Sequence, residues 1–124
     1  GGDHTMALAS LSALAQAKQA QGRTGLLWVD AHADINTPDT SPSQALHGMP
    51  VAALLGLGDT EFVALAGSVP ALDPRHIVYI GLRDLDPGEI VRLKDMNITA
   101  FGMQDIATLG IDEVMRRAAR VLEG

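Results

Sequence analysis

The sequence contains no cysteine among its 124 residues, which excludes disulfide cross-links and thiolate metal sites. Any bound metal would therefore be held by histidine and carboxylate side chains, and a chain without disulfides is typical of the cytoplasm. Aromatic residues make up only 3% of the chain although hydrophobic residues make up 47%. The core must therefore be largely aliphatic, with Trp28 as its single large anchor.

Basic residues and long hydrophobic runs are also scarce. Nine Lys and Arg stand against fifteen Asp and Glu, and the resulting net charge of -6 repels phosphate backbones and anionic membranes. The longest mostly apolar stretches, Met6–Ala15 and Val51–Leu57, are far shorter than the roughly 20 residues that a bilayer requires, and no basic leader with a cleavage site opens the chain. We expect no nucleic-acid partner and no membrane span.

The length is that of one small domain, so we expect a single α/β domain over residues 1–124. Short apolar runs of the kind buried in parallel sheets predict strands at Gly25–Asp30, Ile77–Gly81 and Ile98–Phe101. Composition, caps and periodicity predict the intervening helices, and the alternation favours right-handed crossovers. The expected helices are Thr5–Gln21, Pro50–Leu55, Thr60–Ala66, Pro87–Lys94 and Ile111–Glu123.

Polar side chains follow the first two expected strands. Asp30, His32 and Asp34 come after the first, at the start of a polar loop that extends to Gly48, and Asp84 and Asp86 come after the second. Ligands of open α/β sheets bind outside the carboxyl ends of the strands. The sequence therefore predicts a functional site at this edge of the sheet.

Asp30, His32 and Asp34 alternate along the chain, so an extended backbone turns all three side chains the same way. A cation would offset the repulsion between two close carboxylates, and oxygen with imidazole ligands suits Mn or Zn. The alternative is a solvated loop whose acids cap a helix. His4 alone could be a cap, a packed side chain or a ligand, and His47 alone could be a loop histidine or a proton shuttle.

Four motifs in order carry a resemblance to a known family: Gly-Gly-Asp-His, Asp-Ala-His-Ala-Asp-Ile-Asn-Thr-Pro, Leu-His-Gly-Met-Pro and Gly-Leu-Arg-Asp-Leu-Asp-Pro-Gly-Glu. Together they resemble arginase, of the ureohydrolase family, along essentially the whole chain. The resemblance implies a three-layer α/β/α sandwich with a parallel sheet, of which about three strands are present here.

The resemblance also implies a reaction. In arginases a binuclear manganese site activates a bridging water, which attacks the guanidinium carbon of L-arginine to give urea and L-ornithine. By motif match, His4, Asp30 and Asp34 resemble the ligands of one manganese. Asp30, as the bridging ligand, and His32 resemble those of the other.

The remaining roles follow by the same match. His47 resembles the proton shuttle of the family. His47 and the metal ligand Asp34 are the two residues to which the resemblance gives a catalytic role. Asn36 and Ser43 match positions that bind the substrate α-carboxylate, and Asp86 matches the acid that meets the α-amino group. This pattern favours arginine over agmatine, which has no carboxylate, while Asp84 and Glu89 receive supporting roles.

Two departures from the family pattern affect these expectations. Ser43-Gln44-Ala45 stands where arginases usually carry Ser-Gly-Asn, so the loss of an amide at Ala45 should weaken α-carboxylate binding. The Ser-Phe-Asp-Val-Asp segment that supplies two further ligands is absent from this sequence, so we expect weak or single-metal binding, doubtful activity and self-association. The alternatives are a hydrolase acting on agmatine or another guanidino compound, and a non-catalytic metal-binding or self-associating module.

Overall fold

The structure is a computed structural model that describes residues 3–18, 23–67 and 70–124. The chain divides into two compact units: the first unit is Gly1–Thr24 with Asp34–Asp73, and the second unit is Gly25–Ala33 with Pro74–Gly124. The expectation of a single domain stays a prediction.

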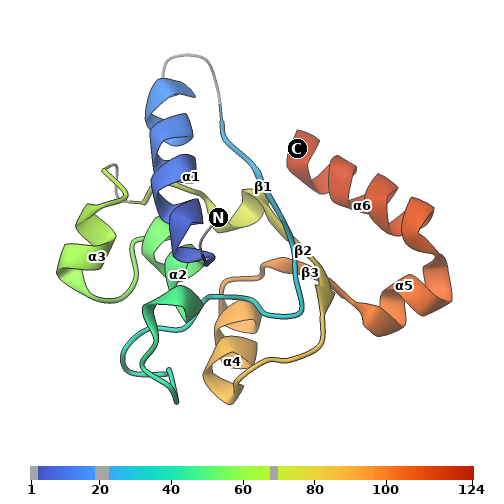
Figure 1. Cartoon of the computed structure of the whole chain (residues 1–124). Helices are drawn as coiled ribbons and strands as arrows, with labels where there is room; N and C mark the ends of the chain where they lie inside the picture. Colours follow the sequence, from blue (N-terminus) through green and yellow to red (C-terminus); the bar gives the residue numbers. More distant parts are fainter. Residues whose placement is uncertain (1–2, 19–22, 68–69) are drawn as a thin grey trace. The chain divides into compact units, whose positions relative to one another are not determined.

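The second unit contains a parallel sheet with strand order β1-β2-β3 (Figure 1). The strands are β1 (Leu26–Val29), β2 (Ile77–Leu82) and β3 (Thr99–Gly102). Every residue of β2 is buried, which explains its continuous apolar sequence, because a central parallel strand is covered on both faces. The predicted three-stranded parallel sheet is confirmed, although β3 begins one residue after Ile98.

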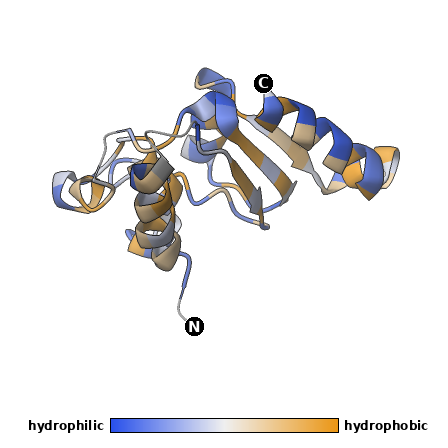
Figure 2. Ribbon diagram, turned by 90° about the horizontal axis from the view of Figure 1, so that it is seen from above, coloured by the Kyte–Doolittle hydropathy of each residue, from blue (hydrophilic) through white to orange (hydrophobic). Residues whose placement is uncertain are grey.

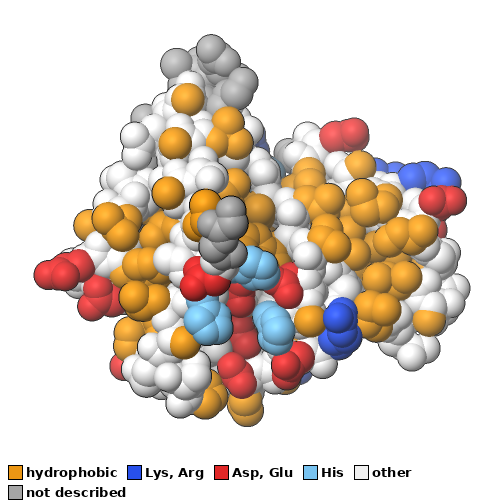
Figure 3. Space-filling view, in the orientation of Figure 1, with side chains coloured by type: hydrophobic (Ala, Val, Ile, Leu, Met, Phe, Trp, Pro, Cys, Tyr) orange, Lys and Arg blue, Asp and Glu red, His pale blue; other side chains and the backbone are white. Residues whose placement is uncertain are grey.

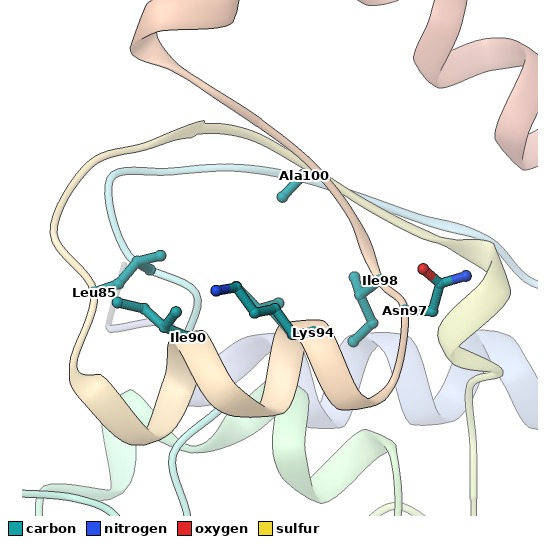
Figure 4. A pocket seen from close by; sticks show the side chains of 7 residues that line it. Leu85, Ile90, Lys94, Asn97, Ile98 and Ala100 are labelled. Carbon is teal, nitrogen blue, oxygen red and sulfur yellow. The ribbon is translucent and has the colours of Figure 1, made fainter.

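Helices cover both faces of this sheet, as expected for an α/β/α arrangement. On one face, Val78 and Ile80 of β2 pack against Val114 and Ala118 of α6 (Ile111–Glu123). The apolar side of α6 makes this contact and its polar residues lie on the other side (Figure 2). On the opposite face, α4 (Pro87–Asp95) lies beside Ala100 of β3 (Figure 4).

The start of α4 is well defined. Pro87 occupies its first turn, and the Glu89 carboxylate accepts a hydrogen bond from the backbone nitrogen of Asp86 at 3.1 Å. An open cavity of about 380 Å³ lies between α4 and β3 (Figure 4). Its lining is mostly apolar: Leu85, Ile90, Leu93, Lys94, Asn97, Ile98 and Ala100.

The first unit is helical. Its helices are α1 (Thr5–Lys18), α2 (Pro50–Leu54) and α3 (Thr60–Ala64), and a 3-10 turn, η1, spans Leu46–Gly48. Every residue of α2 is buried, while Asp59 caps α3 by accepting a hydrogen bond from Phe62 at 3.0 Å. The last predicted residues of the first helix, 19–21, lie outside the described residues.

Two features of the second unit were not predicted. The short helix α5 (Met103–Leu109) lies between two glycines, Gly102 and Gly110, and its first turn is closed by the Asp105 carboxylate, which accepts from the Gly102 nitrogen at 2.8 Å. A 3-10 turn, η2 (Pro74–His76), precedes β2. No helix among the described residues has the length and apolar character to cross a membrane.

The large core side chains also differ from the expectation. Trp28 is buried, with 8% of its surface exposed, but Tyr79 is completely buried and lies among the largest enclosed side chains. Tyr79 therefore shares the anchoring role that the sequence assigned to Trp28 alone.

Candidate functional site

The Asp30–Asp34 segment continues from the carboxyl end of β1. The Asp30 nitrogen donates to the Ile80 carbonyl at 3.0 Å, which extends the β1–β2 pairing to this residue. Three residues later, the Ala33 carbonyl accepts a hydrogen bond from the Tyr79 hydroxyl at 2.6 Å. The central strand therefore holds the segment at two points.

In the second unit, His32 lies between two carboxylates. Its Nε2 is 3.0 Å from Asp84 Oδ2 and its Nδ1 is 3.4 Å from Asp30 Oδ1. The Asp30 side chain is 11% exposed, whereas those of His32 and Asp84 are 54% and 78% exposed. The arrangement presents an accessible imidazole beside a largely buried acid.

Backbone hydrogen bonds bring Asp84 to this position. The nitrogens of Arg83 and Asp84 both donate to the Ala31 carbonyl at 3.0 Å, which joins the loop after β2 to the loop after β1. Gly81 has a positive φ of 89°, and an added Cβ there would lie 3.5 Å from the Asp30 carbonyl oxygen. Since 3.5 Å is an ordinary contact distance, glycine is favoured at this position of β2 by its left-handed backbone and not by lack of space.

In the first unit, Asp34 pairs with His4. The distance from His4 Nδ1 to Asp34 Oδ2 is 2.7 Å, and the Asp34 side chain is 8% exposed against 55% for His4. Asp34 has a φ of 49°, in the left-handed region that residues other than glycine seldom adopt, and its carbonyl accepts from the Val51 nitrogen at 3.0 Å. Such backbone strain is frequent at functional sites.

His47 and His4 both contribute to a lowered pKa of Asp3. The pKa of Asp3 is lowered, first by hydrogen bonds from Thr5 and then by the charges of His47 and His4. The Asp3 carboxylate accepts from the Thr5 nitrogen at 2.9 Å, at the start of α1. His47 is exposed and lies in η1. The start of α1 and η1 therefore gather one carboxylate and two imidazoles in the first unit.

Asn36 and Ser43 lie at the two ends of one loop of the first unit. Asn36 is 4% exposed, its nitrogen donates to the Gly48 carbonyl at 3.1 Å, and its Oδ1 accepts from the Thr40 hydroxyl at 3.0 Å. Ser43 is exposed, and its hydroxyl oxygen accepts from the Ala45 nitrogen at 3.3 Å. Asp86 lies in the second unit, where it precedes α4.

A second cavity of the second unit, of about 440 Å³, opens beside Asp30. Hydrophobic side chains gather on this surface around α5 and α6 (Figure 3). The lining residues are Val29, Asp30, Ala31, Ile80, Gly81, Arg83, Met103, Ile106 and Ile111. Asp30 therefore lies at the edge of a mostly apolar cavity.

Three residues take a larger part in the structure than the sequence predicts: Asp84, Tyr79 and Gln44. Asp84 received only a supporting role, yet it is a direct partner of His32. For Tyr79 a signal was available, because a buried tyrosine hydroxyl generally requires an acceptor. Gln44 donates to two carbonyls within its own loop, and the sequence had marked it only as a departure from the family pattern.

The chain is similar to known proteins over nearly its whole length. A sequence profile described as Arginase family matches residues 1–124. Arginase from Bacillus caldovelox is 39% identical over 123 residues, which cover 99% of this chain and 40% of that protein. Arginase from Staphylococcus aureus (strain MRSA252) is 44% identical over 123 residues, covering 99% and 39% respectively.

Solved structures of arginases are also similar to this chain. The native structure of Bacillus caldovelox arginase superposes with a TM-score of 0.93 at 39% identity, covering 99% of this chain and 40% of that one. Entamoeba histolytica arginase in complex with L-ornithine gives a TM-score of 0.91 at 35% identity, covering 98% and 40%. The chain thus spans about 40% of the length of these relatives.

Proposed function

Because the chain belongs to the arginase family, we propose that the protein hydrolyses L-arginine to L-ornithine and urea with manganese as its cofactor. The Asp30–Asp34 segment carries the proposal. It presents the carboxylates of Asp30 and Asp34 and the imidazole of His32. His32 lies beside Asp30 in the second unit, and Asp34 pairs with His4 in the first unit. These oxygen and nitrogen donors suit a manganese ion.

Four residues would hold the metal: His4, Asp30, His32 and Asp34. The fit is chemical, since each imidazole already has a carboxylate oxygen within 3.4 Å and the set contains no soft sulfur donor. When bound, manganese would lower the pKa of a water molecule and so supply a nucleophile for the guanidinium carbon. The carboxylate of Asp84, 3.0 Å from His32 Nε2, would orient the ring and fix its tautomer.

The substrate roles rest on the motif match and on local geometry. The exposed imidazole of His47 would carry protons near neutral pH. Asn36 and the Ser43 hydroxyl would donate to the α-carboxylate of arginine, and Asp86 would accept from its α-amino group. An α-carboxylate site favours arginine over agmatine. Cytoplasmic location and self-association stay predictions.

The test is a calorimetric titration of the metal-free protein with Mn²⁺, followed by urea release from arginine and from agmatine. We expect saturable metal binding and faster turnover of arginine. Equal or faster turnover of agmatine would reject the proposed substrate. A folded protein that neither binds Mn²⁺ nor releases urea would reject the proposed function as a whole.

Ala45→Asn is expected to lower the KM for arginine. The family usually has asparagine at this position, and Ala45 has φ -79° and ψ 128°, an extended backbone that asparagine can adopt. A hydrogen bond to a charged group contributes about 1.5–3 kcal/mol, which corresponds to a KM about tenfold lower or more. Steady-state kinetics with arginine measures this change.

The matched control is Ala119→Asn, because Ala119 is exposed on α6 in the second unit. Its KM should equal that of the wild type. If Ala45→Asn leaves the KM unchanged, the added amide does not reach the α-carboxylate and the proposed role of this loop is wrong.

A further inference from the structure

Gln44 stands at a strained position of the substrate-binding loop. Its φ is 59°, in the left-handed region that disfavours residues with a branched or long side chain. At the matching position arginases usually carry glycine, which adopts this conformation without a steric penalty. A glutamine with this backbone conformation requires stabilising contacts from neighbouring residues.

The hydrogen bonds of Gln44 supply that support. Its Nε2 donates to the carbonyls of Pro38 and Ser41, both at 2.7 Å, and its backbone nitrogen donates to the Ser41 hydroxyl oxygen at 3.0 Å. One side chain therefore ties the end of the loop to two earlier points in it. Ser41 is itself only 7% exposed, so one of these points is fixed by packing.

The same loop is closed at its other end by threonines. The nitrogens of Thr40 and Ser41 donate to the Thr37 carbonyl at 3.0 and 2.9 Å. The Thr40 hydroxyl donates to Asn36 Oδ1 at 3.0 Å and accepts from the Thr37 nitrogen at 3.0 Å. Asn36 is thereby linked through Thr40 to the turn that Gln44 closes.

We propose that Gln44 is a positioning residue for substrate binding: its side-chain amide closes the 38–44 loop and so fixes the separation of Asn36 and Ser43, the two groups assigned to the α-carboxylate. This inference rests on the proposed function. Gln44 donates both of its amide hydrogens within the loop and acts through its neighbours. These side-chain hydrogen bonds offset the steric penalty of the left-handed backbone and, in addition, hold the loop closed.

Three variants separate the side chain from the backbone. Gln44→Ala removes the amide and keeps the Cβ, while Gln44→Gly removes both the amide and the strain. Gln44→Asn keeps an amide and tolerates a left-handed backbone, but it is one methylene too short to reach both carbonyls. The control is Gln104→Ala, because Gln104 is an exposed glutamine on α5 whose amide donates to the Thr108 hydroxyl at 3.4 Å.

The measurement is steady-state kinetics with arginine and with agmatine on the manganese-loaded protein. We expect all three Gln44 variants to raise the KM for arginine about fivefold to tenfold with kcat nearly unchanged, which marks a loss of uniform binding. The KM for agmatine should stay constant, because agmatine has no α-carboxylate. A general structural defect would change both substrates alike and would contradict the inference.

A second measurement does not depend on activity. Amide hydrogen exchange of Thr40, Ser41 and Gln44 should accelerate about fivefold or more in the Gln44 variants and stay unchanged in Gln104→Ala. If Gln44→Asn and Gln44→Gly match the wild type in both exchange and KM, the side-chain hydrogen bonds do not hold the loop and the inference is overturned. If the wild type releases no urea, the proposed function fails, and unchanged exchange in the variants would still reject the role of Gln44.

Discussion

Asp30→Ala is expected to weaken Mn²⁺ binding more than about 100-fold. In the proposed site Asp30 would be a direct ligand of the metal, and loss of an outer partner of a ligand already costs about 10–100-fold in affinity. The Asp30 side chain is only 11% exposed and lies at the carboxyl end of β1. Calorimetric titration of the metal-free protein measures the affinity, and the rise in melting temperature on adding Mn²⁺ gives an independent readout.

Two further variants make the result specific. Asp30→Asn keeps the shape of the side chain and the Oδ1 atom that accepts from the His32 nitrogen at 3.1 Å, but removes the charge. It should lose binding almost as fully as the alanine variant. Asp39→Ala removes an exposed acid from the following loop and should bind as the wild type does. Wild-type affinity in both Asp30 variants would show that the metal, if it binds, is held elsewhere.

Tyr79→Phe is expected to destabilise the protein by about 1–3 kcal/mol. The substitution removes the hydroxyl that donates to the Ala33 carbonyl at 2.6 Å, and both residues are completely buried. A buried carbonyl that loses its donor keeps the cost of its desolvation. Urea denaturation measures the change as a shift in midpoint with an unchanged m-value.

The matched control is Ser10→Ala, since the Ser10 hydroxyl donates to the Met6 carbonyl at 3.3 Å on the exposed side of α1. Its stability should lie within about 0.5 kcal/mol of the wild type. If Tyr79→Phe is equally mild, the Ala33 carbonyl finds another donor and the Tyr79 hydroxyl is not an anchor of the Asp30–Asp34 segment.

The sheet was largely predictable from local patterns. The sequences of β1 and β2 are short apolar runs followed by acids, and strands buried in a parallel sheet typically have such continuous apolar sequences. Helix α4 was predictable from Pro87 and Glu89, which mark its first turn. Helix α5 was not, because seven residues between two glycines carry too little periodicity to separate a short helix from a loop.

For the candidate site the sequence predicts a chemistry, which stays a prediction, but little of the geometry. The alternation of Asp30, His32 and Asp34 indicates a cation, and the order of motifs indicates the family. The contact between His32 and Asp84 spans 52 positions, so no local spacing encodes it. The hydrogen bonds of Gln44 were equally hidden, since they depend on a left-handed backbone that a glutamine codes for weakly.

The pairing of β1 with β2 has a consequence for the order of folding. Leu26 pairs with Ile77, 51 positions later, whereas Val78 pairs with Thr99, 21 positions later. Closing the longer loop costs about 0.8 kcal/mol more in chain entropy, and contacts between distant residues generally form late. We therefore expect the β2–α4–β3 crossover to form first, and β1, which is followed by Asp30 and His32, to pair with β2 afterwards. Asp30 and His32 would then reach their places only after the rest of the sheet has formed.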